Sequence, residues 1–144
     1  MLTYERDLVV NWGESDPFGL VYFPRILAWF NDTEHELFAR LGYPVNKMID
    51  ESRSAFVMGE IRFKFVGPAA YGEKIRSTVK VEKITRSTIL WQCSAVNLDT
   101  DTKMTEGLAT RIYAQIMEDG NLKSQTIPDD IRSLLEAETD LTSA

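Results

Sequence analysis

An acidic residue lies inside an unusually aromatic stretch near the start of the chain. The segment from Trp12 to Ile26 reads WGESDPFGLVYFPRI, with Asp16 set among its aromatic side chains. A carboxylate there could act as a general base or a nucleophile, since Asp has a reference pKa of about 3.9 and is ionised at neutral pH. The competing interpretation is structural, because a residue before proline favours extended backbone and Asp can bond its own backbone in a turn. On spacing alone, the turn is favoured.

The position of Asp16 just before a predicted helix favours chemistry. Pro24 suits a first helical position, because the N–H that proline lacks would be unpaired there. The remaining unpaired N–H groups at a helix start, with the positive end of the helix dipole, can hold an oxyanion. A carboxylate beside such a site, in apolar surroundings, would form a hydrolytic pair.

Other potentially reactive side chains receive structural interpretations. His35, the only histidine, lies one helical turn from Asp32, and without a further ligand cluster we expect a solvated helix face and no metal site. Cys93 falls on the apolar positions of an alternating strand pattern, which favours a buried residue over a nucleophile. Ser15 and Ser87 lack a histidine partner, which argues against a serine triad.

The first half of the chain predicts one strand and one long helix. Alternation over Tyr4–Trp12 is typical of a strand, and two glycines and a proline mark residues 13–19 as a loop. Over Pro24–Leu41 the apolar residues fall at helical spacing. Glu34 and Glu36 are predicted as charges on the helix surface, although Glu34 falls near the apolar stripe and could point inward.

The second half predicts mostly antiparallel strands. Long runs rich in Val, Ile, Thr and aromatic residues are separated by the short polar turns ITRS and DTDTK, and short connections join antiparallel neighbours. Met48 and Ile49 indicate either a short helix or an ordered loop. Pro128 opens a predicted last helix, and residues from about Thr139 are expected to be frayed. The predicted strands are Ile61–Phe65, Ile75–Ile84, Thr88–Leu98 and Met104–Met117.

These elements predict an α+β fold in a single domain over residues 1–144. The apolar stripe of the helix must be buried, and one face of the antiparallel sheet is the only large apolar surface available. We therefore expect the sheet to wrap the helix. A chain of 144 residues is long enough to bury such a core without a metal or a disulfide.

Charge and composition argue against several classes of protein. The net charge of −6 and the pI of about 4.8 argue against general nucleic-acid binding, but not against a small anionic ligand held by local cations. The chain has one cysteine and a charged start without an apolar signal region, so we expect a cytoplasmic protein. No run of residues is long enough to span a membrane.

The segment WGESDPFGLVYFPRIL resembles the signature of hotdog-fold acyl-CoA thioesterases of the 4-hydroxybenzoyl-CoA thioesterase type. The shared frame is G-x-x-D-x-x-G-x-V-x-x-P, and a Trp follows it in the helix, here Trp29. FKFVGPAAYGEKI and IPDDIR also fit, so that the resemblance runs from about Tyr4 to Arg132. The residues that fill the frame are Gly13, Asp16, Gly19, Val21 and Pro24.

This resemblance implies a fold, an assembly and a chemistry. The implied fold is the hotdog fold, here a five-stranded antiparallel sheet around a long central helix. The implied assembly is a homodimer with joined sheets, often paired into a homotetramer, with active sites at subunit interfaces. Asp16 would act as nucleophile or general base, and the backbone N–H of Phe23 would polarise the thioester carbonyl. Arg86, with Lys83 and Ser87 as weaker matches, would bind the CoA phosphates. CoA is part of the substrate, so no separate cofactor is implied.

Three positions depart from the family's pattern. Phe18 replaces a residue that is usually small, which would narrow or reshape the acyl pocket. Phe23 replaces Tyr or His, and Asn31 replaces an acid. These departures count against 4-hydroxybenzoyl-CoA itself as the substrate. The aromatic residues of the segment, Tyr22 among them, are predicted to form a dry tunnel for the acyl-thioester with Asp16 as its only reactive group.

Two alternative functions stay open on the same residues. Hotdog hydratases and dehydratases generally use a histidine paired with an acid, and His35 is remote from Asp16 in the chain, so this alternative ranks low. A non-catalytic acyl-CoA binder needs the same tunnel and the same hairpin cations. The sequence does not distinguish such a binder from an enzyme.

Overall fold

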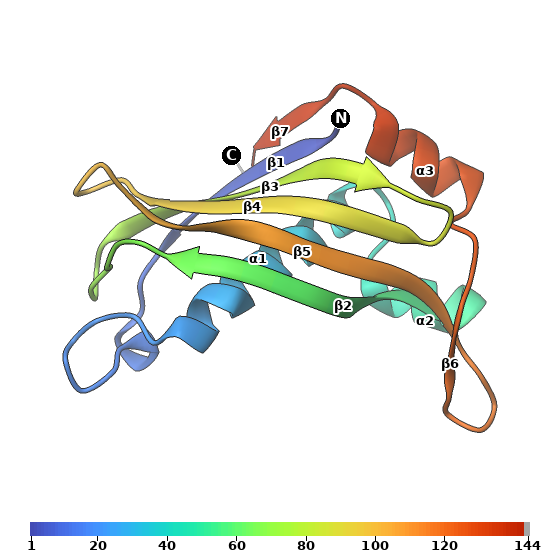
Figure 1. Cartoon of the computed structure of the whole chain (residues 1–144), viewed down its shortest axis with the longest axis horizontal. Helices are drawn as coiled ribbons and strands as arrows, with labels where there is room; N and C mark the ends of the chain where they lie inside the picture. Colours follow the sequence, from blue (N-terminus) through green and yellow to red (C-terminus); the bar gives the residue numbers. More distant parts are fainter. Residues whose placement is uncertain (143–144) are drawn as a thin grey trace.

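One curved sheet wraps one long helix in the computed structural model, which describes residues 1–142 (Figure 1). The strands are β1 (Thr3–Val9), β2 (Ser54–Phe65), β3 (Lys74–Ile84), β4 (Thr88–Asn97), β5 (Thr102–Ile116), β6 (Leu122–Ser124) and β7 (Asp140–Thr142). The helices are the 3₁₀ helix η1 (Trp12–Glu14), the long helix α1 (Phe23–Arg40), α2 (Val45–Ser52) and α3 (Asp129–Glu136). The strand order is β2-β5-β4-β3-β1-β7, with β6 paired to β5.

The predicted antiparallel core of the sheet is confirmed. The two tight hairpins join β3 to β4 and β4 to β5, while β2 pairs with β5 and β1 pairs with β3. All four pairings are antiparallel, and short connections indicate this for the two hairpins. The α+β prediction, a sheet wrapping a long helix, is therefore correct.

Two short strands, β6 and β7, raise the count within residues 1–142 from the predicted five to seven. β7 lies parallel to β1 with Thr3 opposite Asp140, and the Thr3 N–H donates to the Thr139 carbonyl at 2.9 Å. The expectation of fraying is thus wrong for residues 139–142, while residues 143–144 lie outside the described residues. A three-residue strand held by backbone hydrogen bonds is too short to show a period of two.

The long helix α1 buries its apolar stripe against the concave face of the sheet. The Phe30 and Phe63 rings lie 5.2 Å apart, and Phe38 meets Trp91 edge-on at 6.2 Å. Each fully buried side chain of this size contributes about 1.5–3 kcal/mol. α1 begins one residue before Pro24, the predicted first position.

The two short helices cover one end of the sheet. The segment around Met48 is the helical alternative of the two predicted, and Met48 itself is buried. α3 begins one residue after Pro128 and buries Ile131 and Leu135. No helix within residues 1–142 combines the length and the hydropathy needed to cross a bilayer.

Candidate active site

The loop that carries Asp16 is closed upon itself. The Asp16 N–H donates to the Leu20 carbonyl at 2.7 Å, and the Gly19 N–H donates to the Asp16 carbonyl at 2.9 Å. Asp16 Oδ1 accepts the N–H groups of Phe18 at 2.8 Å and Leu20 at 3.2 Å. Gly19 supplies the positive φ of 80° that this tight loop requires.

The turn interpretation of Asp16 therefore describes the loop, and it leaves room for chemistry. Only one carboxylate oxygen is used by the turn, and Oδ2 has no hydrogen-bond partner among residues 1–142. The turn fixes the orientation of the carboxylate, and the second oxygen stays free for a substrate or a water. The two interpretations of Asp16 are compatible.

Glu14 fastens this loop to α1. Its Oε2 accepts the indole N–H of Trp29 at 2.6 Å, and its Oε1 accepts the Asn11 N–H at 2.8 Å. The Tyr22 N–H also donates to the Glu14 carbonyl at 2.9 Å. Sequence reasoning missed Glu14, because no spacing rule links a loop acid to an indole fifteen residues later.

The start of α1 offers one free backbone donor near this loop. Tyr22 is the N-cap residue, and Pro24 has no N–H. The Arg25 N–H donates to the Tyr22 carbonyl at 2.9 Å. Phe23 therefore carries a first-turn N–H that has no partner in the described part of the chain, which suits the predicted oxyanion site.

The aromatic side chains around this loop form an exposed surface instead of the predicted closed tunnel. Phe18 is 87% exposed and Trp12 is 74% exposed. Phe23 contacts Phe65 of β2 at 5.9 Å between ring centroids, and Trp12 meets Tyr71 edge-on at 5.4 Å. We define the aromatic patch as Trp12, Phe18, Tyr22, Phe23, Phe65 and Tyr71. One chain supplies one wall, so the tunnel prediction is wrong for a single chain.

The hairpin predicted to bind CoA phosphates lies between β3 and β4. Lys83 is exposed at a bulge in β3. Arg86 Nη1 donates to Thr126 Oγ1 at 2.9 Å, and the Ser87 carbonyl accepts the Tyr113 N–H at 2.7 Å. The hairpin is thus held to neighbouring segments by hydrogen bonds. The other guanidinium N–H groups of Arg86 have no hydrogen-bond partner among residues 1–142.

The loop before α1, which carries Asp16, and the hairpin between β3 and β4, which carries Arg86, lie at opposite ends of the sheet (Figure 1). Val9, at the end of β1 before the Asp16 loop, pairs with Lys74 at the start of β3. From Lys74 the strand runs to Ile84 at the hairpin, a length of about 33 Å at ~3.3 Å per residue. One chain does not bring the predicted catalytic and phosphate-binding residues together.

A buried charged network lies beneath the middle of α1. Arg111 Nε donates to Glu34 Oε2 at 3.0 Å, and Arg111 Nη2 donates to Asn31 Oδ1 at 2.9 Å. Burial raises the pKa of the Glu34 carboxyl, and the Arg111 guanidinium offsets only part of that rise. The surface prediction for Glu34 is wrong and the inward alternative is correct. Arg111 was missed, although it occupies one of the alternating buried positions of β5.

The structural interpretation of Cys93 is confirmed, and His35 contacts the backbone of its own helix. Cys93 is buried, and burial raises the pKa of its thiol to about 12, which leaves no thiolate for attack. The His35 Nδ1–H donates to the Asn31 carbonyl at 2.7 Å. Within residues 1–142, no group of three or more His, Cys, Asp or Glu side chains is arranged to hold a metal ion.

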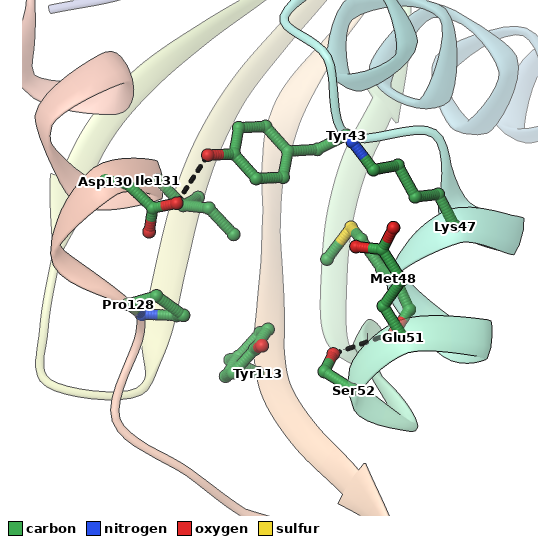
Figure 2. A pocket seen from close by; sticks show the side chains of 9 residues that line it. All are labelled: Tyr43, Lys47, Met48, Glu51, Ser52, Tyr113, Pro128, Asp130 and Ile131. Atoms are coloured by element: carbon green, nitrogen blue, oxygen red, sulfur yellow. Dashed lines mark hydrogen bonds between the residues drawn. The ribbon is translucent and has the colours of Figure 1, made fainter.

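A separate cleft of about 180 Å³ lies between α2 and α3. Figure 2 shows the Tyr43 hydroxyl pointing across this cleft to Asp130, to which it donates at 2.5 Å. This bond holds the pKa of the Asp130 carboxyl below its ordinary value. None of the residues in the Asp16 loop lines the cleft, so it is distinct from the predicted catalytic position. The lining residues are Tyr43, Lys47, Met48, Glu51, Ser52, Tyr113, Pro128, Asp130 and Ile131.

Comparison with known proteins assigns the chain to a family. Residues 10–135, from just after β1 to the last turn of α3, match the Thioesterase-like superfamily. The chain belongs to this superfamily. The matched residues include the Asp16 loop, α1 and the strands β2 to β5.

A curated relative of this superfamily member has a named activity. It is the 1,4-dihydroxy-2-naphthoyl-CoA hydrolase of Thermosynechococcus vestitus (strain NIES-2133 / IAM M-273 / BP-1), which is 24% identical over 84 residues. Those residues are 58% of this chain and 56% of the relative. The match therefore spans a little over half the length of that protein.

Solved thioesterase structures share the fold of the superfamily member. A 1,4-dihydroxy-2-naphthoyl-CoA thioesterase from Synechocystis has a TM-score of 0.83 at 13% identity, covering 92% of this chain and 95% of that one. A 4-hydroxybenzoyl-CoA thioesterase mutant in complex with 4-hydroxybenzoyl-CoA has a TM-score of 0.85 at 16% identity, covering 93% and 99%. The predicted hotdog fold is confirmed.

Proposed function

We propose that this superfamily member hydrolyses acyl-CoA thioesters to a free acid and CoA. The observation that carries the proposal is the Asp16 carboxylate, fixed by its own loop with one oxygen free, directly before the unpartnered N–H of Phe23 at the start of α1. Membership of the Thioesterase-like superfamily supports the same reaction. The non-catalytic binder remains the alternative to be tested.

The proposed reaction needs only these two groups. Asp16 either attacks the thioester carbonyl or takes a proton from the water that attacks it. The Phe23 N–H holds the oxyanion that develops on the carbonyl oxygen. The C–S bond then breaks, and CoA leaves as a thiolate without strong acid help, since a thiol has a pKa of about 8.5. The attacking route through Asp16 forms an acyl anhydride, which water then hydrolyses.

The active site is proposed to form between subunits of a homodimer or homotetramer. The aromatic patch is too exposed to exclude water on its own, and large exposed apolar side chains gathered around one loop favour an interface. β2 is an edge strand of the sheet, and its exposed side chains include Met58, Ile61 and Phe65. Pairing this edge with a second copy would cover the patch, place Phe18 and Tyr22 in an acyl pocket, and bring a partner hairpin toward Asp16.

We expect sedimentation velocity at low micromolar concentration to show a dimer or a tetramer. The physical reason is that a free apolar edge strand is stabilised by pairing with another edge. A subunit-mixing assay sharpens the test: Asp16→Asn and Arg86→Glu subunits, mixed and reassembled, should recover activity at low acyl-CoA that neither parent has. A stable, active monomer, or mixtures no better than the parents, would contradict the shared site.

We expect Arg86→Glu to raise KM for acyl-CoA about tenfold or more and to leave kcat nearly unchanged. Charge-assisted hydrogen bonds to phosphate contribute about 1.5–3 kcal/mol, and phosphates far from the thioester bind equally in the ground and transition states. Two other arginines are less suited to bind the phosphates, because each is already paired with a carboxylate. Arg62 is paired with Glu60 at 2.8 Å and Arg76 with Asp7 at 2.9 Å. Steady-state kinetics measures the change.

An acyl-pantetheine substrate, which lacks the nucleotide, is the control for this variant. Its KM should change little in Arg86→Glu. Equal weakening of both substrates would mean that the substitution disturbs the fold. If neither substrate were weakened, the phosphate site would lie elsewhere, with Lys64 next to be substituted.

Thiol release separates the proposed enzyme from the alternatives. A thioesterase produces free thiol and free acid in equal amounts, a binder produces neither, and a hydratase alters the acyl chain without releasing thiol. The first acyl groups to test are those in the relatives' names, 1,4-dihydroxy-2-naphthoyl and 4-hydroxybenzoyl, beside aliphatic chains of several lengths. We expect no added metal or cofactor to be required.

A further inference from the structure

Arg111 connects the buried side of the sheet to the surface of α1. Its Nε donates to Glu34 Oε2 at 3.0 Å, and its Nη1 lies 3.5 Å from the Phe56 carbonyl oxygen. Arg111 is 6% exposed and Glu34 is 5% exposed, whereas Asn31 is an exposed residue. The buried guanidinium of Arg111 therefore contacts a carboxamide at the surface, since its Nη2 donates to Asn31 Oδ1 at 2.9 Å.

The contact with Arg111 fixes which way the Asn31 carboxamide faces. A guanidinium can only donate, so the atom that faces it must be the carboxamide oxygen Oδ1. The Asn31 NH₂ group then faces away from Arg111, and in the part of the chain that the structure describes it has no hydrogen-bond partner. Because Glu34 neutralises Arg111, the surface receives two N–H donors without a net charge.

Asn31 stands in line with the proposed oxyanion donor. Phe23, Leu27 and Asn31 are spaced by four residues and follow one side of α1. Eight residues of helix rise about 12 Å, and helical side chains lean toward the N-terminus. The Asn31 amide therefore lies roughly 8–12 Å along the helix from the Phe23 N–H. An acyl group held at Phe23 and extended along this side would bring its far end to Asn31.

We infer that Arg111, with Glu34 as its counter-ion, is a positioning residue that fixes Asn31 as a hydrogen-bond donor and selects acyl groups with an accepting oxygen at the far end. This inference rests on the proposed function. An acid at this position would accept a hydrogen bond from a hydroxyl. The donating carboxamide instead prefers a carbonyl, carboxylate or phenolate oxygen. The ligand class is thus an aromatic-sized acyl-CoA with a distal acceptor.

Isosteric substrate pairs test this preference. In 4-acetylbenzoyl-CoA and 4-isopropenylbenzoyl-CoA, and in the corresponding 6-substituted 2-naphthoyl pair, a carbonyl oxygen and a CH₂ group occupy the same place. The wild-type chain should favour the acetyl member of the better-fitting pair about tenfold in kcat/KM, the effect of one hydrogen bond. Asn31→Leu should lose the preference.

The positioning role is tested by substituting the buried pair together. Arg111→Met with Glu34→Gln removes both charges at similar volume and frees the Asn31 carboxamide to turn, so the preference should fall to about twofold or less. Arg111→Lys keeps a cationic donor and should retain most of the preference for the acetyl substrate. A merely structural role would lower the activity toward both substrates and leave their ratio unchanged, which would overturn the inference.

Dissociation constants from calorimetry give the same ratio without turnover. Binding that favours the acetyl member while no thiol is released would support the positioning role and contradict the proposed hydrolysis. Thiol release combined with a ratio of dissociation constants near one would support the proposed hydrolysis and contradict the positioning role. If neither member of either pair binds, the inference is overturned.

Discussion

Asp16→Asn should lower kcat for acyl-CoA hydrolysis by about 10²–10⁴-fold while acyl-CoA binding is largely kept. The substitution keeps the shape of the side chain, and the amide oxygen can still accept the N–H groups of Phe18 and Leu20 that hold the turn. What it removes is the negative charge that serves as base or nucleophile. Thiol-release kinetics at saturating substrate measures the loss.

Asp119 offers a matched control for this substitution. Its Oδ1 accepts the Asn121 N–H at 2.9 Å, so it also caps a turn through a carboxylate oxygen. Asp119→Asn should leave kcat unchanged, and the melting temperatures of the two variants should differ little. Near-normal kcat in Asp16→Asn would remove Asp16 from the mechanism, whatever the stability of the loop.

Glu34→Ala should lower the free energy of unfolding by about 3–5 kcal/mol, the usual cost of leaving a buried charge without its partner. Arg111 would keep its charge at 6% exposure with only the Asn31 and Phe56 oxygens to contact. Urea unfolding at one fixed protein concentration measures the change, since oligomerisation makes apparent stability depend on concentration. Asp32→Ala, an exposed acid on the same helix, should change stability by less than about 0.5 kcal/mol.

A double substitution distinguishes the lost charge partner from lost packing. Glu34→Leu with Arg111→Met removes both charges and fills similar volume, and such replacements are often neutral or stabilising. We expect the double variant to be more stable than Glu34→Ala. If Glu34→Ala were as mild as Asp32→Ala, the network would be unimportant for folding.

Most of the fold follows from patterns that one sequence displays. The change of period from two to 3.6 at Pro24 marks α1, and the alternation with short polar turns marks β3, β4 and β5. The wrapping of the sheet around the helix follows because one amphipathic helix and one sheet must cover each other, and the resemblance of the Asp16 segment identified this arrangement as the hotdog fold. β7 could not be predicted in this way, since three residues paired through backbone atoms leave no side-chain pattern.

The candidate site was only partly predictable. Asp16 and Phe23 stand out through the proline, the glycines and the helix start that surround them. The contact of Glu14 with Trp29 spans 15 positions, and that of Glu34 with Arg111 spans 77, so neither pair shares a local pattern. The alternation of β5 does put Arg111 on its buried face, and a charged residue at such a position is a signal that a buried partner exists.

The exposure of the aromatic patch explains why neither the sequence nor the structure of one chain defines the acyl pocket. Phe18 and Tyr22 are apolar enough to line a pocket, yet they are 87% and 51% exposed. In the proposed oligomer, a second copy would supply the opposite wall. Shape and length of the acyl pocket are then properties of the assembly.

The most direct test is simultaneous measurement of free thiol and free acid from a panel of aromatic and aliphatic acyl-CoAs with the wild-type protein. Hydrolysis through Asp16 predicts that at least one acyl-CoA yields thiol and acid in equal amounts over many turnovers, and that Asp16→Asn abolishes most of both. Saturable binding of acyl-CoA without release of either product, across the whole panel, would contradict the account and identify the chain as a binder.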